Sequence, residues 1–359
     1  MSPCYNVNVT GNVYIRRFPM SIQTIRDIAE IAGVSVATVS RVMNNKPDVN
    51  PETRKKVESV ILQHRFVGNR NARELKQNDR SAIAILIHGR SNPFLYALSE
   101  RILSMTDALP CGTVTEYVDE KDNELDIALD LLHRKDLKGI IFVGSHIDSF
   151  SEPYHGFDLP IVFATVSARD AGLPYASSVC IDDRKMAREA VRVLLENGHR
   201  DIAVFGASPV GSGLFSSRFR GVTDAFAEYG LQFSMDCFRE CRFSIHDGYE
   251  TALAYFRENP DTTALFAMSD SIAIGAMRAL RDLGLSVPED VSVFGFDGVE
   301  MCNYTVPRLS TVIQPVGRIA EETVAMMASM INDNSAPRHI VTEAQLSVNE
   351  SVQKRSGHL

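Results

Sequence analysis

The segment from residue 201 to residue 216 has the glycine spacing of a phosphate-binding loop. Gly206 follows the apolar run "DIAVF", and Gly211 stands five positions later, as the pattern G-x-x-x-x-G-K-[ST] requires. Ser212 occupies the position of the lysine that would reach the phosphates, and Ser216 replaces the third glycine of a dinucleotide-binding loop. The segments "GSG" and "SDS" lack the flanking residues of a nucleophile elbow. The sequence therefore does not support nucleotide chemistry, and we predict that the protein is not an enzyme.

The six cysteines are too scattered for a metal centre. The closest pair, Cys237 and Cys241, has no matching second pair, and His246 is the only convenient further ligand. A structural zinc ion needs four ligands. We therefore expect no metal and no other cofactor.

Charge is divided unevenly along the chain. Residues 1–80 contain 13 Lys and Arg against 7 Asp and Glu, a net charge of +6, whereas the remainder carries −14. A basic head on an acidic body indicates a polyanionic partner for the head alone. The longest apolar runs are too short to span a bilayer, and no early segment resembles a secretory signal. We expect a cytoplasmic protein without a membrane partner.

The basic head must position its side chains on three short helices. Thr24 begins "TIRDIAEIAG", and with Asp27 it resembles a capping box. Ser35 can cap a second helix, "VATVSRVM", after a turn at Gly33, and Asn50 can cap a third with proline in its first position. This spacing predicts a helix-turn-helix. A small helical bundle docked on the body is the alternative.

The second helix turns Val39 inward. Its outer face carries Val36, Ala37, Ser40 and Arg41. Small methyl groups fit against the thymine methyl, and arginine pairs with guanine O6 and N7, whereas hydroxyl groups suit phosphates. This outer face is therefore a candidate surface for reading the major groove.

The segment "TIRDIAEIAGVSVATVSRVMNN" closely resembles the DNA-binding head of the lactose/galactose-repressor family of bacterial transcription regulators. The shared core is "T..DIA..AGVS..TVSR..N", followed by "V...TR.KV", and the resemblance continues from about Met20 to Ser347. It implies binding to double-stranded DNA at a palindromic operator. The implied DNA-binding residues are Thr24, Ser35, Val36, Ala37, Thr38, Ser40, Arg41, Asn44, Asn50 and Thr53.

The polar segment 67–80 joins the head to the body. Composition alone favours a solvated linker, but "NRNARELK" resembles the hinge helix of the family, in which a leucine wedges into the minor groove. The leucine at that motif position is Leu75. A helix this short is not stable alone in water, so we expect it to form only on DNA.

From residue 81 onward, short apolar runs alternate with helical ones. The predicted strands are "AIAILIH", "TVTEYV", "GIIFVG", "IVFATV", "DIAVFGA", "ALFAMSD" and "VSVFGFD". This alternation predicts parallel sheets covered on both faces. The fold class is thus a small all-α head plus an α/β body, and the resemblance implies two lobes like those of periplasmic sugar-binding proteins. We predict residues 1–19 as a disordered tail or start-site artefact, 20–66 as the DNA-binding domain, 67–80 as the hinge, 81–350 as the effector-binding and dimerisation domain, and 351–359 as a tail.

Four residues match the family's ligand positions. Arg218, in its R-x-x-G motif, is implied as a donor to ligand oxygens, and Asp270 as an acceptor from ligand hydroxyls or amines. Phe94 and Phe243 are implied as aromatic walls. The ordinary alternatives are a surface charge for Arg218, a helix cap for Asp270, and core positions for both phenylalanines. Thr165 stands where some members have an aspartate, and Gly298 follows Asp297 where a second acidic or amide residue is common.

These features together predict a homodimeric DNA-binding transcription regulator, most simply a repressor. A small molecule of the sugar or the nucleoside and purine class would bind between the lobes and modulate operator affinity. A solute-binding receptor without regulatory DNA binding is the alternative, although it would require export.

Overall fold

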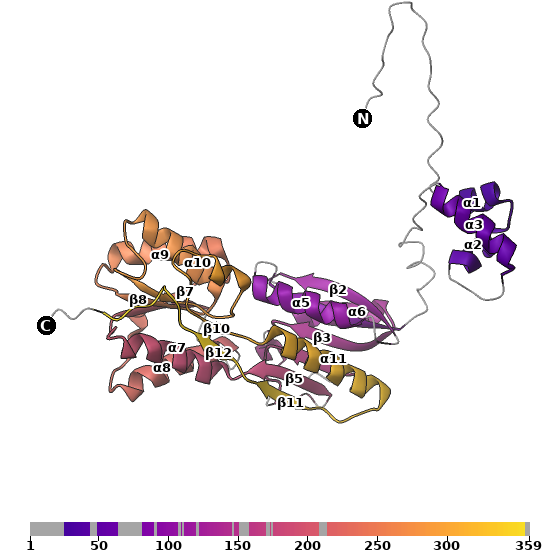
Figure 1. Cartoon of the computed structure of the whole chain (residues 1–359). Coiled ribbons are helices and arrows are strands. Elements are labelled where there is room, and N and C mark those ends of the chain that lie inside the picture. The colour runs from indigo at the N-terminus through magenta and orange to yellow at the C-terminus, as the bar shows by residue number, and fades with distance from the viewer. Residues whose placement is uncertain are drawn as a thin grey trace, which may run out of the picture. The chain divides into compact units, whose positions relative to one another are not determined.

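The computed structural model describes residues 25–43, 49–63, 81–89, 92–106, 109, 111–119, 122–145, 147–150, 158–169, 173, 175–207 and 214–355. The chain divides by its internal contacts into two units, Met1–Asp79 and Arg80–Leu359. We call the first unit the head and the second the body (Figure 1).

The head contains the three predicted helices, α1 (Ile25–Ala32), α2 (Val36–Met43) and α3 (Pro51–Gln63). Ser35 caps α2, because its Oγ accepts the Thr38 backbone N–H at 3.1 Å. Asn50 caps α3, because its Oδ1 accepts the Glu52 backbone N–H at 2.8 Å. Each cap satisfies a donor that a helix start would otherwise leave unpaired. The predictions of a cap at Ser35 and at Asn50 are confirmed.

The three helices of the head share one small core. Ile28 and Ala32 of α1, Val39 of α2 and Val57 of α3 are completely buried in it. Gly33 makes the turn between α1 and α2 with a φ of +60°, a conformation that costs glycine little. Packing rather than intrinsic propensity therefore stabilises α2, whose β-branched residues are mediocre helix formers.

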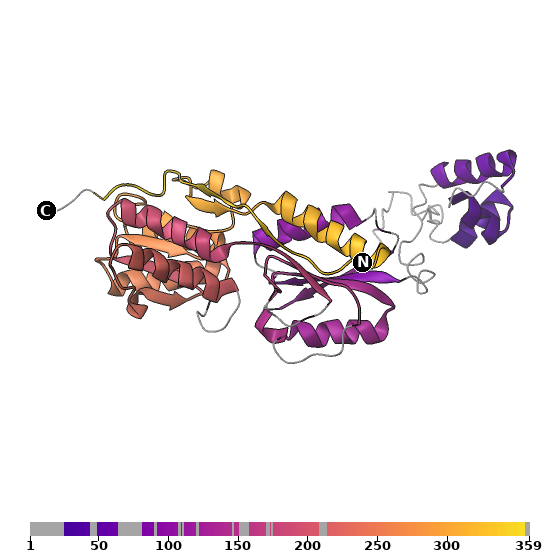
Figure 2. The same cartoon turned by 90° about the horizontal axis from the view of Figure 1, so that it is seen from below.

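The first lobe of the body is a six-stranded parallel sheet. Its strands are β1 (Ala82–His88), β2 (Gly112–Val118), β3 (Leu137–Val143), β4 (Ile161–Ala164), β5 (Ala176–Ile181) and β11 (His339–Thr342). They lie in the order β11-β5-β4-β3-β1-β2. Helices α5 (Pro93–Thr106) and α11 (Val316–Asn332) cover one face, and α6 (Glu124–Arg134) covers the other (Figure 2).

The alternation of side chains along β1 explains these layers. Ile83 and Ile85 lie in the core shared with α5 and α11, whereas Ala84 and Leu86 lie in the core shared with α6. Successive residues of a strand point to opposite faces, so a strand that is apolar throughout needs helices on both sides.

The second lobe is a four-stranded parallel sheet with the order β7-β6-β8-β9. Its strands are β6 (Ile202–Gly206), β7 (Phe238–Glu240), β8 (Ala264–Ala267) and β9 (Ser292–Phe294). Helices α7 (Asp183–Glu196) and α8 (Leu214–Glu228) pack on one face, and α9 (Ile245–Glu258) and α10 (Asp270–Asp282) pack on the other. The predicted fold class, with two parallel-sheet lobes, is confirmed.

The chain crosses between the lobes three times. It passes from β5 into α7, from β10 (Thr311–Ile313) into α11, and from β11 into β12 (Gln345–Ser347). Strands β10 and β12 pair antiparallel. In the described part of the chain, no helix is both long enough and apolar enough to span a bilayer.

The structure confirms all seven predicted strands but adds others, of which β5 is the most central. Its sequence, "ASSVCI", is fully buried despite two serines. Ser177 Oγ accepts the Arg338 backbone N–H at 3.0 Å, and Ser178 Oγ lies 2.9 Å from His339 Nδ1. Both partners lie 161 positions away along the chain, so no local pattern reveals that these hydroxyls are satisfied.

The predicted tail after residue 350 requires a correction. Ser351 is completely buried, its backbone N–H donates to the Arg308 carbonyl at 3.0 Å, and its Oγ donates to the Val293 carbonyl at 2.6 Å. The segment up to residue 355 is part of the second lobe, because the Gln353 backbone N–H also donates to Ser292 Oγ of β9 at 3.1 Å and the Arg355 backbone N–H donates to the Asn197 carbonyl at 2.8 Å.

Candidate functional site

The strand orders place a crevice at the carboxyl edge of each sheet. In lobe 1, β1 lies between β2 and β3, and in lobe 2, β6 lies between β7 and β8. In each lobe, the two strands that follow β1 or β6 along the chain are therefore added on opposite sides of it, so the strand order reverses at β1 and at β6. Ligands of open parallel sheets bind beyond the carboxyl ends of the strands at such points. The residues that follow these strands are therefore candidates for ligand contact.

Arg218 of α8 is buried in lobe 2 with only 3% of its surface exposed. Its Nε donates to Asp183 Oδ1 at 2.8 Å, and its Nη1 donates to the Met268 carbonyl. Its guanidinium carbon lies 3.7 Å from the centre of the Phe296 ring, a favourable cation–π distance. Among the described residues, nothing accepts a hydrogen bond from Nη2, whose nearest acidic atom is Asp297 Oδ1 at 3.7 Å. The guanidinium is thus fixed in orientation while one nitrogen keeps its donors available.

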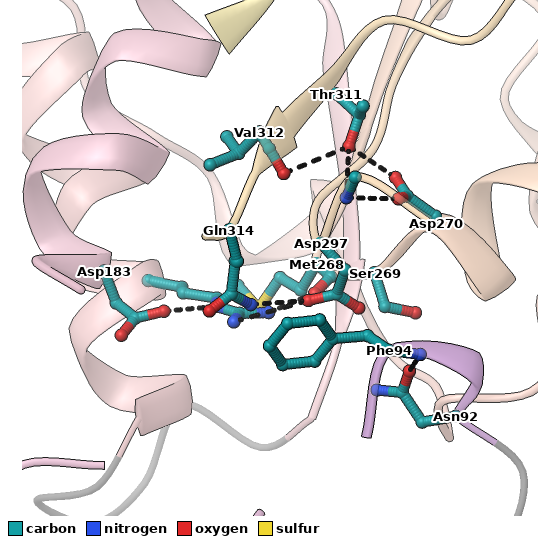
Figure 3. A network of polar contacts seen from close by, with 12 residues as sticks. Asn92, Phe94, Asp183, Met268, Ser269, Asp270, Asp297, Thr311, Val312 and Gln314 are labelled. Atoms are coloured by element: carbon teal, nitrogen blue, oxygen red, sulfur yellow. Dashed lines mark hydrogen bonds and ion pairs between the residues drawn. The ribbon is translucent and has the colours of Figure 1, made fainter. Parts of the chain in front are cut away.

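Asp297 follows β9 and lies at the centre of this group (Figure 3). Its Oδ1 accepts the Gln314 Nε2–H at 2.9 Å, and its backbone has a φ of +121°. A non-glycine residue in that region is strained, and such strain concentrates at ligand sites. Burial raises the pKa of Asp297, Arg218 opposes the shift, and Asp270 and Asp183 add to it, with a resulting pKa of about 8. The Asp297 carboxyl therefore holds its proton near neutral pH.

Asp270, the acidic residue predicted from the sequence, has a different set of contacts. Its Oδ2 accepts the backbone N–H groups of Gly298 at 2.7 Å and Val299 at 2.9 Å, and its Oδ1 accepts the Thr311 hydroxyl at 2.6 Å. It is fully buried, and burial raises its pKa to about 6. Its carboxylate fixes the loop that carries Asp297. Sequence reasoning missed Asp297 as a site residue, although "VFGFDG" marks it as an acidic residue that ends a strand.

The two predicted aromatic residues lie in different surroundings. Phe94 is 4% exposed at the start of α5, which Asn92 caps, and Figure 3 shows its ring pointing from lobe 1 toward Asp297 and Gln314. Phe243 is half-buried before α9 and packs against the cores on both faces of the lobe 2 sheet. The structure thus brings Phe94 to the group around Arg218 and places Phe243 in the wall of lobe 2.

Lobe 1 contributes two further polar features that were not among the four ligand residues predicted from the sequence. Thr165 follows β4 with a φ of +86°, and its buried Oγ1 has no hydrogen-bond partner among the described residues. Ser145, just beyond β3, donates to Glu124 Oε2, which lies 3.9 Å from Nδ1 of His88 at the end of β1. A buried unsatisfied hydroxyl is uncommon and needs an explanation. For Thr165 the only sequence signal was its departure from the aspartate found in some relatives.

Residues of both lobes line a common hollow of about 250 Å³. Its lobe 1 wall includes Val166 and Cys180, and its lobe 2 wall includes Asp183, Arg184 and Ser217. Because Asp183 is also the ion-pair partner of Arg218, this hollow adjoins the buried cluster formed by Arg218, Asp297 and Gln314.

The head presents the outer face of α2 to solvent. Val36, Ala37 and Arg41 are exposed, and Thr38 and Ser40 are half-buried. On the preceding and following segments, Ser35 and Asn50 are exposed and Thr53 is half-buried. The predicted DNA contacts at Thr24, Asn44 and Leu75 lie outside the described residues.

Comparison with known proteins identifies the same two parts. Residues 24–69 match the family described as "Bacterial regulatory proteins, lacI family", and residues 191–352 match the "Periplasmic binding protein-like domain". The HTH-type transcriptional regulator MalR of Clostridium butyricum is 32% identical over 329 residues, which cover 90% of this chain and 97% of that protein. The catabolite control protein A of Priestia megaterium is 29% identical, with 89% and 95% covered.

Solved structures show the same architecture over nearly the whole chain. The complex of the transcriptional regulator CelR with cellobiose has a TM-score of 0.67 at 26% identity, with 92% of this chain and 99% of that chain covered. The Lac repressor bound to ONPG in its repressed state has a TM-score of 0.68 at 26% identity, with the same coverage.

Proposed function

This chain belongs to the lacI family of bacterial regulatory proteins, and from that premise we propose how it acts as a transcription regulator. Such regulators are not enzymes. We propose that two copies bind a palindromic operator as a repressor, in the cytoplasm where the DNA lies, and that a small molecule in the body alters their affinity. The solute-receptor alternative is not favoured, because the head matches the regulatory family over residues 24–69.

The observation that carries the proposal is the exposed outer face of α2. Val36, Ala37 and Arg41 project from a helix whose opposite side is fixed by Val39 and Val42 in the core of the head. The first residues of a recognition helix meet base edges in the major groove. Since one head covers only half a site, a palindromic operator needs two copies of the chain.

An exposed apolar segment of lobe 2 supports the dimer. Met301 is 49% exposed, Tyr304 74% and Val306 96%, and all three lie in the segment that joins β9 to β10. Large apolar side chains gathered on one surface indicate a contact with another protein. We propose that this segment contributes to the interface between the two copies.

The proposed effector site consists of Arg218, Asp297 and Gln314, with the Phe94 ring of lobe 1 pointing toward them (Figure 3). We add Thr165, which directly precedes Val166 of the hollow, as a further member. The sequence suggested Asp270 as the acidic residue that contacts the ligand. We assign that contact to Asp297 instead, because the Asp270 carboxylate already accepts three hydrogen bonds. Phe243 is proposed only as part of the surrounding wall. A ligand oxygen can accept from Arg218 Nη2, and a ligand group can satisfy the Thr165 hydroxyl.

The site is well placed to control the angle between the lobes. Asp183 lies just beyond β5, and Gln314 directly follows β10, so the polar group includes residues from two of the three crossings. An effector that rearranges these hydrogen bonds favours one lobe arrangement over another. Its coupling to DNA binding should be about 1–3 kcal/mol, as is usual between distant sites.

The regulator hypothesis can be tested by selecting operators from random double-stranded DNA with the full-length protein. We expect a palindromic sequence to be enriched and its affinity to change when the correct sugar, nucleoside or purine is added. The control is a Val36→Asp variant, which keeps the core of the head but should enrich no sequence. If the folded wild-type protein enriched no sequence, that result would contradict the proposal.

Leu75 provides a separate prediction for the hinge. If its side chain wedges between base steps, Leu75→Ala should reduce operator affinity by roughly 10-fold or more, because the kinked DNA loses its apolar support. Effector-induced melting shifts should be unchanged, since the body is a separate unit. Glu74→Ala serves as the control at the neighbouring position, and operator affinity equal to wild type in Leu75→Ala would rule out the wedge.

A further inference from the structure

Two buried carboxyl groups, those of Asp183 and Asp297, lie beside the single cation Arg218 at the proposed effector site, and a third, that of Asp270, lies near Asp297. Asp183 is 7% exposed, Asp270 is completely buried and Asp297 is 3% exposed. In the described part of the chain, Arg218 is the one positively charged side chain that forms an ion pair with any of them. The cluster therefore contains more buried acid than buried base.

Arg218 has little capacity left to neutralise a further negative charge. Its Nε is committed to Asp183 at 2.8 Å and its Nη1 to the Met268 carbonyl. The remaining nitrogen, Nη2, already lies 3.7 Å from Asp297 Oδ1. A buried ion that gains no partner is strongly unfavourable, so a carboxylate or phosphate placed here would remain largely uncompensated.

The surrounding groups sharpen this imbalance. Burial raises the pKa of Asp183 to about 6 and that of Asp297 to about 8, so both carboxyls are already destabilised in their charged forms. The groups that face Asp297 are Arg218 from α8, Asp183 from α7, Asp270 from α10 and Gln314 after β10, and the Cys302 thiol, in the segment between β9 and β10, lies near enough to interact with it. The opposite edge, in lobe 1, adds the buried Glu124, which accepts from Ser145. Among the described residues that line the hollow, Arg184 is the one cation, and its Nε and Nη2 already donate to Asp224.

We infer that the effector carries no negative charge where it meets Arg218 and Asp297. This inference rests on the proposed effector site. The matching ligand group is a hydroxyl, amide or amine: an oxygen accepts from Arg218 Nη2, and a neighbouring O–H or N–H lies against Asp297. Free sugars, amino sugars, nucleosides and purine bases satisfy this requirement. Uronates, sugar phosphates and nucleotides do not.

Matched ligand sets test the inference directly on the full-length protein. One set comprises free sugars with the corresponding amine, uronate and phosphate, and a second comprises a purine base with its nucleoside and nucleotide. Melting temperature and operator affinity are measured with each ligand. We expect an uncharged or amine member to act and its anionic counterpart to bind weaker by roughly 100-fold or more. Tighter binding of the uronate, phosphate or nucleotide would overturn the inference, whereas no response to any member would contradict the effector site itself.

A variant tests the buried charge without any ligand. The unfolded-state pKa of Asp297 is near 3.8 and its folded-state pKa near 8, so the native state keeps a proton that the unfolded state loses, and wild-type stability falls as pH rises between these values. An asparagine at this position cannot ionise, and its side-chain oxygen can still accept from Gln314. We therefore expect Asp297→Asn to have a higher melting temperature than wild type, with the gap widening by about 2–4 °C or more between pH 5 and pH 8.

The matched control for this measurement is Asp224→Asn. Asp224 is half-buried, and its pairing with Arg184 lowers its pKa, so this variant should show no widening gap over the same range. A gap for Asp297→Asn that stays constant or narrows from pH 5 to pH 8 would show that the site does not hold excess buried acid.

Discussion

Arg218→Ala is expected to shift the response to the effector to much higher effector concentrations while leaving operator binding by the unliganded protein in place. Hydrogen bonds to a charged donor are worth about 1.5–3 kcal/mol each, so the loss of Nη2 alone should weaken effector binding by roughly 10- to 100-fold. The variant also leaves Asp183 buried without the partner that now lies 2.8 Å away. Breaking a buried pair in this way costs about 3–5 kcal/mol, so the melting temperature should fall as well.

Lysine should not rescue this position. A lysine has no planar fork, and it could not hold Asp183 and the Met268 carbonyl in their present directions. The matched control is Arg220→Ala, on the same helix but exposed to solvent, which should respond to the effector like wild type. Operator affinity measured by fluorescence anisotropy, with and without effector, decides the matter. A normal effector response in Arg218→Ala would show that Arg218 does not belong to the effector site.

The second large effect is expected at Arg41 on the outer face of α2. If its guanidinium pairs with a guanine in the major groove, Arg41→Ala should cost about 1–3 kcal/mol on the selected operator and relax the preference at that base pair. Affinity for random DNA should change little. The measurement is a comparison of both DNAs at one salt concentration, because phosphate contacts make every affinity salt-dependent.

Lys55→Ala provides the contrast for Arg41, because Lys55 is exposed on α3 rather than on the recognition helix. It should weaken binding to both DNAs equally, as expected for a phosphate contact. An equal loss on both DNAs for Arg41→Ala would instead assign Arg41 to a phosphate as well.

The sequence alone determined the head, the fold class and most strands, because these depend on neighbours close along the chain. Ser35 caps a helix that begins at the next residue, and Val39 and Val42 are buried because helical spacing puts them on one side. The same local rules identified the apolar runs that became β1, β3 and β8. Packing on α1 and α3 then explains why a helix of poor propensity forms and leaves its outer face exposed.

Only the tertiary structure decided which acidic residue lies beside Arg218. Asp270 and Asp297 both follow a strand, so the sequence could not distinguish them, but Asp270 turns to the backbone of Gly298 and Val299 while Asp297 lies beside the guanidinium. Asp183, Arg218 and Gln314 are likewise far apart in the chain and meet only where α7, α8 and the segment between β10 and α11 converge. Burial and charge pairing depend on the whole fold, and they determine which ligand the site can accept.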